Sequence, residues 1–99
     1  MYYTQSTTNQ AKVKQMQKLM NRLKARRLFL NITQLELAAA TGVSQPTIAQ
    51  IELGNITRPR AGTINSLARA LHVTPGWLEK HDKPLAEENV MLKLLDDKE

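Results

Sequence analysis

The sequence predicts an all-α protein, a compact bundle of five helices with a mobile N-terminal arm and a C-terminal segment that can add one more helix. Three observations predict this fold class: apolar residues recur at helical spacing, helix-capping residues precede these runs, and the connections are short. Ninety-nine residues, 41% of them hydrophobic, suffice for one small core but not for two. We therefore expect one domain over residues 14–80, preceded by a flexible arm at 1–13 and followed by an acidic tail or linker, with helical potential, at 81–99.

The first expected helix runs from about Lys14, or somewhat earlier, to about Phe29. The arm before it is rich in Thr, Gln and Asn, which bury too little apolar surface to fix one conformation. Within the helix, side chains at three- and four-residue spacing form a stripe that closes the core, namely Met16, Met20, Leu23 and Arg27.

A capping box marks the second helix. Thr33 precedes the helix and Glu36 follows three residues later, so each side chain can accept a hydrogen bond from the backbone N–H of the other. The helix is therefore expected to begin at Gln34 and to end near Ala40 or Thr41.

Residues 34–53, which read QLELAAATGVSQPTIAQIEL, are predicted to form a helix-turn-helix. The two helices of this motif cross so closely that one position takes a small side chain, here Ala38, and the turn takes a glycine at positive φ, here Gly42. Ile48 and Ile51 then turn inward at an i, i+3 spacing. Each residue type is common by itself, so the prediction depends on the whole set.

The third helix is predicted to carry groups suited to base recognition on its outer face. Ser44 caps it by accepting a backbone N–H, and Pro46 falls in the first turn, where no N–H is needed. Glutamine pairs bidentately with adenine in a major groove, and a small apolar group touches the thymine methyl. The sequence therefore predicts a helix that reads double-stranded DNA with its outward side chains, which are Gln45, Thr47, Ala49 and Gln50.

Two further helices are expected after a loop. The fourth covers about residues 61–71, and its inward side chains recur at helical spacing. The fifth is short and starts at Thr74 and Pro75. It contains Trp77, for which packing in the core or at a dimer interface is favoured over stacking on a ligand or a base.

The net charge of +5 is distributed unevenly along the chain. Residues 1–69 carry ten Lys or Arg against two acidic residues, a balance of +8, whereas residues 70–99 carry four against seven, a balance of −3. In the loop before the fourth helix, Arg58 and Arg60 bracket Pro59, which presents two guanidinium groups stiffly. Such a basic excess attracts phosphates and predicts DNA binding that weakens steeply with salt.

The remaining composition excludes several classes of function. There is no cysteine, and His72 and His81 are expected to be solvated surface residues without nearby ligands, so no metal site and no cofactor are predicted. No nucleophile–base pair or phosphate-cradling glycine loop is visible, so we do not expect an enzyme. No stretch approaches the roughly twenty apolar residues that span a bilayer, and the start, MYYTQSTTNQ, is too polar for a secretory signal. A cytoplasmic protein without membrane contact is therefore expected.

Four segments together carry a family resemblance: RLKARR, TQLELAAATGVSQPTIAQIELG, TRPR and LARALHVTPGWL. From Arg22 to Glu79 the chain resembles the DNA-binding domain of lambdoid phage repressors and Cro proteins, within the xenobiotic-response-element type of regulator. The resemblance implies a lambda-repressor-like five-helix domain that forms a homodimer at least on DNA. It also implies a phage or prophage repressor whose third helices, one from each copy, enter successive major grooves of a two-fold symmetric operator.

The resemblance further implies DNA-binding roles for ten residues. Gln34 matches a residue that binds a phosphate and can also brace Gln45. Gln45 and Gln50 match base-reading positions, and Arg60 matches an arginine that enters the minor groove at the operator centre. The other members are Ser44, Thr47 and Ala49 on the third helix, and Asn55, Thr57 and Arg58, which match a loop that holds the sugar–phosphate backbone.

Arg27 and Glu52 are assigned to architecture and not to DNA binding. Arg27 lies on the buried stripe of the first helix, and Glu52 follows the inward Ile51 at the end of the third. In repressors that this chain resembles, the pair forms a largely buried ion pair. Removing one partner of such a pair leaves a buried charge uncompensated.

Two segments depart from the pattern of this family. The residues before the usual first helix leave open an added DNA-touching arm, a longer helix or no fixed structure. The segment 83–99 has an apolar side and can pack on its own domain, dimerise, bind a partner protein, or begin a linker to a peptidase domain absent from this chain. The apolar side of this segment comprises Leu85, Val90, Met91, Leu94 and Leu95.

One alternative function stays open beside the repressor. In an antitoxin of a toxin–antitoxin pair, the same helix-turn-helix regulates its own gene while the acidic C-terminal segment binds a toxin. A neighbouring toxin gene or a co-purified basic partner distinguishes the two.

Overall fold

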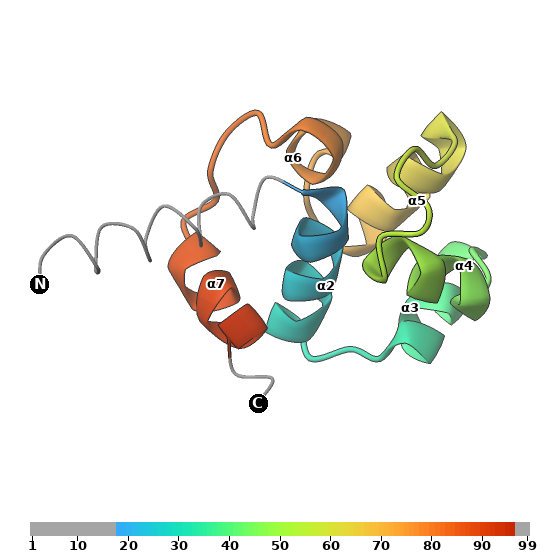
Figure 1. Cartoon of the computed structure of the whole chain (residues 1–99), viewed down its shortest axis with the longest axis horizontal. Coiled ribbons are helices and arrows are strands. Elements are labelled where there is room, and N and C mark those ends of the chain that lie inside the picture. Colours follow the sequence, from blue (N-terminus) through green and yellow to red (C-terminus); the bar gives the residue numbers. More distant parts are fainter. Residues whose placement is uncertain (1–17, 97–99) are drawn as a thin grey trace, which may run out of the picture.

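A computed structural model describes residues 18–96 of the chain as six helices around one core (Figure 1). These residues contain no strand, so the predicted all-α class is confirmed. The expected arm at 1–13 lies outside the described residues. In chain order the helices are α2 (Leu19–Phe29), α3 (Gln34–Thr41), α4 (Gln45–Glu52), α5 (Ala61–Ala70), α6 (Pro75–Lys80) and α7 (Glu88–Asp96).

The start of α2 differs from the prediction. Lys18 has an extended backbone, with φ −93° and ψ 137°, so the helix begins at Leu19 and does not run continuously from Lys14. Lys18 is exposed, whereas Leu19 packs against the core. Because tertiary packing supplies most of the stability of a short helix, the helix begins where that packing begins. Met16, predicted on the buried stripe, lies outside the described residues.

The core surrounds α2, which lies between α7 on one side and α4 on the other, with α6 also packed against it (Figure 1). Both apolar residues at the centre of α2, Leu23 and Ala25, are completely buried. Buried apolar side chains of the other helices complete the core, among them the inward residues predicted for the third helix. They are Ile48 and Ile51 of α4, Ile64, Leu67 and Ala68 of α5, the adjoining Leu71, and Trp77 and Leu78 of α6.

The local signals predicted for the helix-turn-helix are confirmed. Thr33 Oγ1 accepts from the Glu36 N–H at 3.0 Å, and Glu36 Oε1 accepts from the Thr33 N–H at 2.8 Å. Gly42 follows α3 at φ 79°, and a Cβ built there meets nothing within 4 Å, so the backbone conformation and not a lack of space requires glycine. Ser44 then caps α4 by accepting from the Thr47 N–H at 3.2 Å.

Two arginines of α2, Arg22 and Arg26, are buried and donate to backbone carbonyls at the ends of other helices. Arg22 Nε donates to Leu78 O and its Nη2 to Glu79 O, both at 2.6 Å, in the last turn of α6. Arg26 Nε donates to Leu71 O at 2.9 Å, at the C-terminal cap of α5. Helix ends leave such carbonyls without partners, so these arginines fasten α5 and α6 to α2. Burial lowers the pKa of Arg22, and the Glu88 carboxylate counteracts this.

These contacts correct the expected basic surface. Of the eight Lys and Arg that the structure describes within residues 18–69, three are buried, namely Arg22, Arg26 and Arg27. They are therefore unavailable to phosphates, and the charge that meets DNA is smaller than the sequence total suggests.

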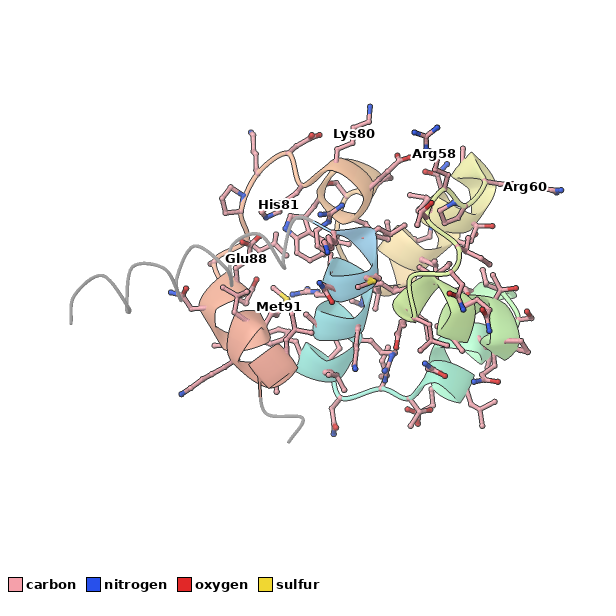
Figure 2. All side chains as sticks on the ribbon, in the orientation of Figure 1. Arg58, Arg60, Lys80, His81, Glu88 and Met91 are labelled. Atoms are coloured by element: carbon pink, nitrogen blue, oxygen red, sulfur yellow. The ribbon has the colours of Figure 1, made fainter. Side chains whose placement is uncertain are left out.

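The C-terminal segment packs on its own domain, one of the four alternatives left open by the sequence. Met91 of α7 is completely buried, and Leu92 and Leu95 pack against the core. Val90, predicted on the apolar side, is 51% exposed, because the helix turns its Met91 side toward α2. Glu88 and Met91 thus lie on the side of the molecule opposite Arg60 (Figure 2).

Glu88 Oε2 takes part in three hydrogen bonds, two of which join α7 to α6 and its C-terminal cap. Its Oε2 accepts from Trp77 Nε1 at 2.7 Å and from the Leu85 N–H at 3.1 Å, and it lies 2.8 Å from His81 Nε2. Burial by itself raises the pKa of Glu88, but the hydrogen bonds from Trp77, His81 and Leu85 outweigh it, so the pKa is lowered. The prediction that His81 is a solvated surface residue is therefore wrong, because only 13% of its side chain is exposed.

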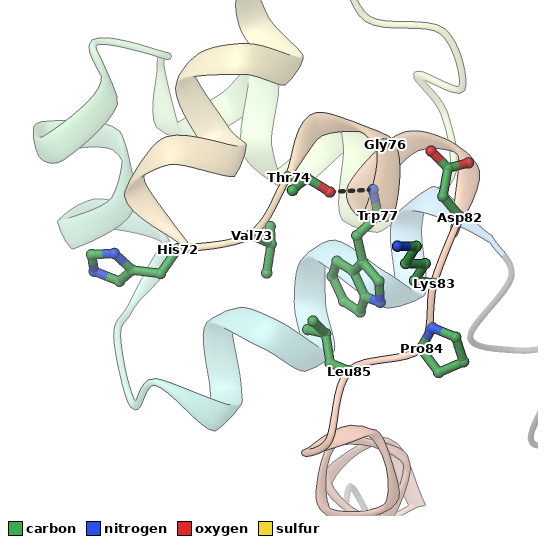
Figure 3. Close-up of a pocket in the computed structure, with 9 residues that line it drawn as sticks. All are labelled: His72, Val73, Thr74, Gly76, Trp77, Asp82, Lys83, Pro84 and Leu85. Carbon is green, nitrogen blue, oxygen red and sulfur yellow. Dashed lines mark hydrogen bonds between the residues drawn. The ribbon is translucent and has the colours of Figure 1, made fainter.

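Trp77 packs in the core, as one of the two predicted alternatives states, with 2% of its surface exposed. One edge of the residue borders an open groove between α6 and the segment that leads to α7 (Figure 3). Val73 and Leu85 line this groove together with Trp77, and Asp82 and Lys83 also lie along it. None of the residues predicted to bind DNA takes part in it.

Candidate nucleic-acid interface

The helix α4 separates its residues into a buried and an accessible face. Ile48 and Ile51 are completely buried, whereas Gln50 is exposed and Thr47 and Ala49 are partly exposed. This separation follows from the i, i+3 spacing of the two isoleucines, which fixes the rotation of the helix about its axis. The predicted base-reading side chains therefore remain accessible along one outer face.

A chain of hydrogen bonds links the interior to the first residue of α4. Gln34 Nε2 donates to Glu52 Oε1 at 3.0 Å, and Gln45 Nε2 donates to Gln34 Oε1 at 2.7 Å. A carboxylate only accepts, so Gln34 must turn its NH₂ group toward Glu52 and its carbonyl toward Gln45. The Gln45 amide is therefore oriented: its NH₂ faces Gln34 and its carbonyl faces away.

Arg27 and Glu52 form the ion pair at the origin of this chain. Arg27 Nε and Nη2 donate to the two oxygens of Glu52 at 2.7 and 2.9 Å, and Arg27 Nη1 donates to Ile32 O at 2.9 Å. The side chains are only 10% and 5% exposed. Bidentate geometry and a further acceptor compensate the buried guanidinium, which ties α2, α4 and the loop before α3 together.

The hydroxyl groups at the start of α4 are also ordered. Ser44 Oγ accepts from the Thr47 N–H and donates to Thr47 Oγ1 at 2.8 Å. The proton of the Thr47 hydroxyl is not used in that contact, so Thr47 retains a donor on the accessible side. This donor matches a phosphate oxygen or a base acceptor in chemistry.

The connection from α4 to α5 presents the loop residues predicted to hold the DNA backbone. Gly54 leaves the helix at φ 85°, so the backbone conformation requires glycine; a Cβ there would meet only the flexible end of Met20, whose Sδ lies 2.7 Å away. Thr57, Arg58 and Arg60 are exposed beyond it. The two guanidinium groups extend away from the ribbon at the α5 side of the molecule (Figure 2).

A further contact at this end of α4 was not anticipated from the sequence. Asn55 Nδ2 donates to Gln50 Oε1 at 2.7 Å. Two exposed leucines flank the interface as well, Leu35 on α3 and Leu53 after α4, at 70% and 67% exposure. The only signal in the sequence for the amide contact is the position of Asn55 one residue beyond the glycine that ends the helix, and this does not specify side-chain directions.

Residues 18–96 hold no group of three His, Cys, Asp or Glu side chains able to bind a metal ion. They also contain no helix of sufficient length and hydrophobicity to cross a bilayer.

The fold and this interface define a DNA-binding protein that uses a helix-turn-helix. The sequence model of a family described as helix-turn-helix matches residues 23–78, more than half of the chain and the whole of α3 and α4. The chain therefore belongs to this helix-turn-helix family, and it is a DNA-binding transcription regulator.

Proposed function

We propose that the chain is a repressor of phage or prophage type that binds a two-fold symmetric operator as a homodimer. In this proposal α4 of each copy enters a major groove of double-stranded DNA, and the bound dimer blocks access of RNA polymerase. The observation that carries the proposal is the oriented amide of Gln45 at the start of α4, held through Gln34 by a buried ion pair. A side chain fixed in this way loses little conformational entropy when it pairs with a base.

The groups presented by Gln45 match adenine. Its carbonyl can accept from the adenine N6 amino group, and the second proton of its NH₂ can donate to adenine N7. Gln34, at the N-terminus of α3, contacts a phosphate in the proposal, where the helix dipole adds to its hydrogen bond. Ser44 and Thr47 supply hydroxyls at the edge of the same groove, and Ala49 offers a methyl to a thymine.

The loop after α4 anchors the protein without reading sequence. Asn55, Thr57 and Arg58 contact the sugar–phosphate backbone, which contributes affinity and salt dependence but no base discrimination. Arg60 enters the minor groove near the operator centre, where a narrow A·T-rich groove attracts a guanidinium. The exposure of Arg58 and Arg60 supports these roles.

The antitoxin alternative receives less support from the C-terminal segment. An antitoxin needs an apolar face free to bind a toxin, but Met91 is buried within the chain's own core. A partner protein or a further domain after residue 96 can still use the outer face of α7, which includes the exposed Val90. A pull-down from the source cell that yields a basic partner bound through α7 favours the alternative.

In vitro selection from random duplex DNA, at roughly physiological salt, tests the proposal, because nonspecific binding is weak there. We expect an inverted repeat whose half-site centres lie about 10–11 base pairs apart, since α4 of the two copies must meet the same face of the duplex. A single, non-repeated site contradicts the dimer, and no enrichment contradicts the assignment as an operator-binding repressor.

A further inference from the structure

The outer face of α4 carries an apolar stripe, formed by Pro46, Ala49 and Leu53. These residues are spaced three and four positions apart, so they lie along one side of the helix. At about 100° per residue, Leu53 lies about 140° and 160° around the helix axis from the two buried isoleucines, Ile48 and Ile51. Pro46, two turns earlier, lies within about 20° of the same direction. The stripe therefore points away from the core.

Leu53 is the largest member of the stripe and the one whose position the fold does not explain. Its backbone continues the helix, with φ −81° and ψ −10°, and its N–H donates to Ala49 O at 2.9 Å. The helical rotation therefore still applies at Leu53 and directs its side chain outward. The residue is 67% exposed, so it gains little of the stabilisation that burial gives a leucine.

The surroundings of the stripe determine which part of DNA matches it. Among residues 45–53 the only charged side chain is that of Glu52, which is nearly buried in its ion pair with Arg27. The stripe therefore offers no cation to a phosphate. Against a polar base edge, an apolar side chain removes water without replacing its hydrogen bonds. The apolar group that DNA offers in the major groove is the methyl at C5 of thymine, and 5-methylcytosine carries the same group at the same position.

We infer that the stripe of Pro46, Ala49 and Leu53 reads pyrimidine 5-methyl groups, and that Leu53 is a specificity-determining residue one helical turn beyond Ala49. This inference rests on the proposed function, because it requires α4 to lie in the major groove. It adds Leu53 to the methyl contact proposed for Ala49. The methyl group read by Leu53 should change the affinity for the operator by about two- to fivefold.

Deoxyuridine tests the inference, because it differs from thymine only in lacking the methyl group. Each thymine of the operator selected by the wild-type chain is replaced in turn, and binding is titrated with wild type and Leu53→Ala. We expect wild type to lose about two- to fivefold at one or more thymines of each half-site. In Leu53→Ala at least one of these losses should disappear, whereas losses that arise from other contacts should stay.

A second comparison identifies the source of the methyl group. At the thymine that depends on Leu53, the T·A pair is replaced by C·G and by 5-methyl-C·G. If the added methyl strengthens wild-type binding by about two- to fivefold but not that of Leu53→Ala, either base supplies the group. If it does not, thymine is the only source. Both results support methyl reading, because deoxyuridine has already measured the dependence on Leu53.

Leu35→Ala is the matched control. Leu35 is 70% exposed, similar to Leu53, but lies on α3 and not on the outer face of α4. This variant should show the same losses with deoxyuridine as wild type. Thermal melting verifies that each variant is folded.

The outcomes distinguish this inference from the proposed function. If wild type selects an operator but loses no affinity with any deoxyuridine, or folded Leu53→Ala keeps every loss, the role of Leu53 is wrong and the operator-binding function stands. The role is also wrong if Leu35→Ala removes the same losses as Leu53→Ala. If wild type selects no sequence at all, both the inference and the proposed function are wrong. A loss that disappears only in Leu53→Ala supports both.

Discussion

Polar side chains lie on both sides of this small domain. On one side their polar groups are bonded inside the fold, and on the other, part of each group stays accessible to solvent. On the side formed by α2, α6 and α7, Arg22 and Arg26 turn inward to backbone carbonyls, and Glu88 accepts three bonds at one oxygen. On the side formed by α3 and α4, Gln45 and Gln50 are held at one end of the amide and keep the other end accessible. The first arrangement stabilises the fold, and in the proposed function the second presents groups to DNA. Substitutions on the two sides should therefore change different measurements.

The largest expected effect is a loss of stability at the boundary between these two sides, where Arg27 forms its ion pair with Glu52. Arg27→Met leaves the Glu52 carboxylate nearly buried without its guanidinium, so we expect a loss of about 3–5 kcal/mol in the free energy of unfolding. Urea denaturation measures this loss. DNA affinity should fall only in proportion to the folded fraction, so complete loss of binding in a variant with wild-type melting would refute the architectural role.

The second effect belongs to the α4 side alone. Gln45→Ala should weaken binding to the preferred site by about 1–3 kcal/mol, because adenine loses a bidentate partner. The unfolding free energy should change little, since the Gln45 side chain reaches no deeper than Gln34. Binding to the preferred and to a scrambled duplex is compared by titration. Equal losses on both duplexes exclude Gln45 as a base reader.

The third effect belongs to the α7 side and depends on pH. The pKa of Glu88 is lowered in the folded state from its ordinary value of 4.5, so the folded protein binds fewer protons than the unfolded chain in acid. This contribution to stability is present above pH 4.5 and is lost as the pH falls through the folded pKa. In Glu88→Gln that part of the acid dependence should be absent, and stability at pH 7 should fall by about 1–3 kcal/mol, because three hydrogen bonds lose a charged acceptor.

Melting curves of wild type and Glu88→Gln between pH 7 and pH 3 measure this difference. Glu79→Gln is the matched control, because Glu79 is an exposed carboxylate on the neighbouring helix α6. Its curve should follow that of wild type. Parallel curves for Glu88→Gln and wild type across the acid range would show that Glu88 does not connect α6 and α7 as an ionised group.

The two sides also differ in how much the sequence revealed. Both limits of α3 and the start of α4 are predictable because their signals are local: Thr33 with Glu36, Gly42 and Ser44 each act within a few residues. The partners of Arg22 and Arg26 are backbone carbonyls 45 to 57 residues away. Every residue has a backbone carbonyl, so the sequence does not show which of them accepts from these arginines. Charge counting therefore assigned these arginines to the surface.

The same reasoning applies to the candidate interface. Which residues of α4 face outward follows from helical periodicity, and the bracing of Gln45 by Gln34 was anticipated only through the family resemblance. The contact between Asn55 and Gln50 depends on the exact backbone path after Gly54, which periodicity does not define. Similarly, the burial of His81 depends on where α7 places Glu88, because α7 follows a loop whose course the sequence does not fix.

The smallest expected effect concerns the loop after α4, where the charge of Arg58 should add affinity for DNA without distinguishing one base from another. Arg58→Ala should weaken binding to all duplexes by similar amounts and lower the salt slope of log K by about one unit, since one fewer counterion is released. Arg69→Ala removes the same charge from an exposed site in the last turn of α5 and provides the control. If both variants change the slope equally, Arg58 acts only through the overall charge. If Arg58→Ala alone changes it, the loop contacts a phosphate directly, and discrimination between sequences is left to the side chains of α4.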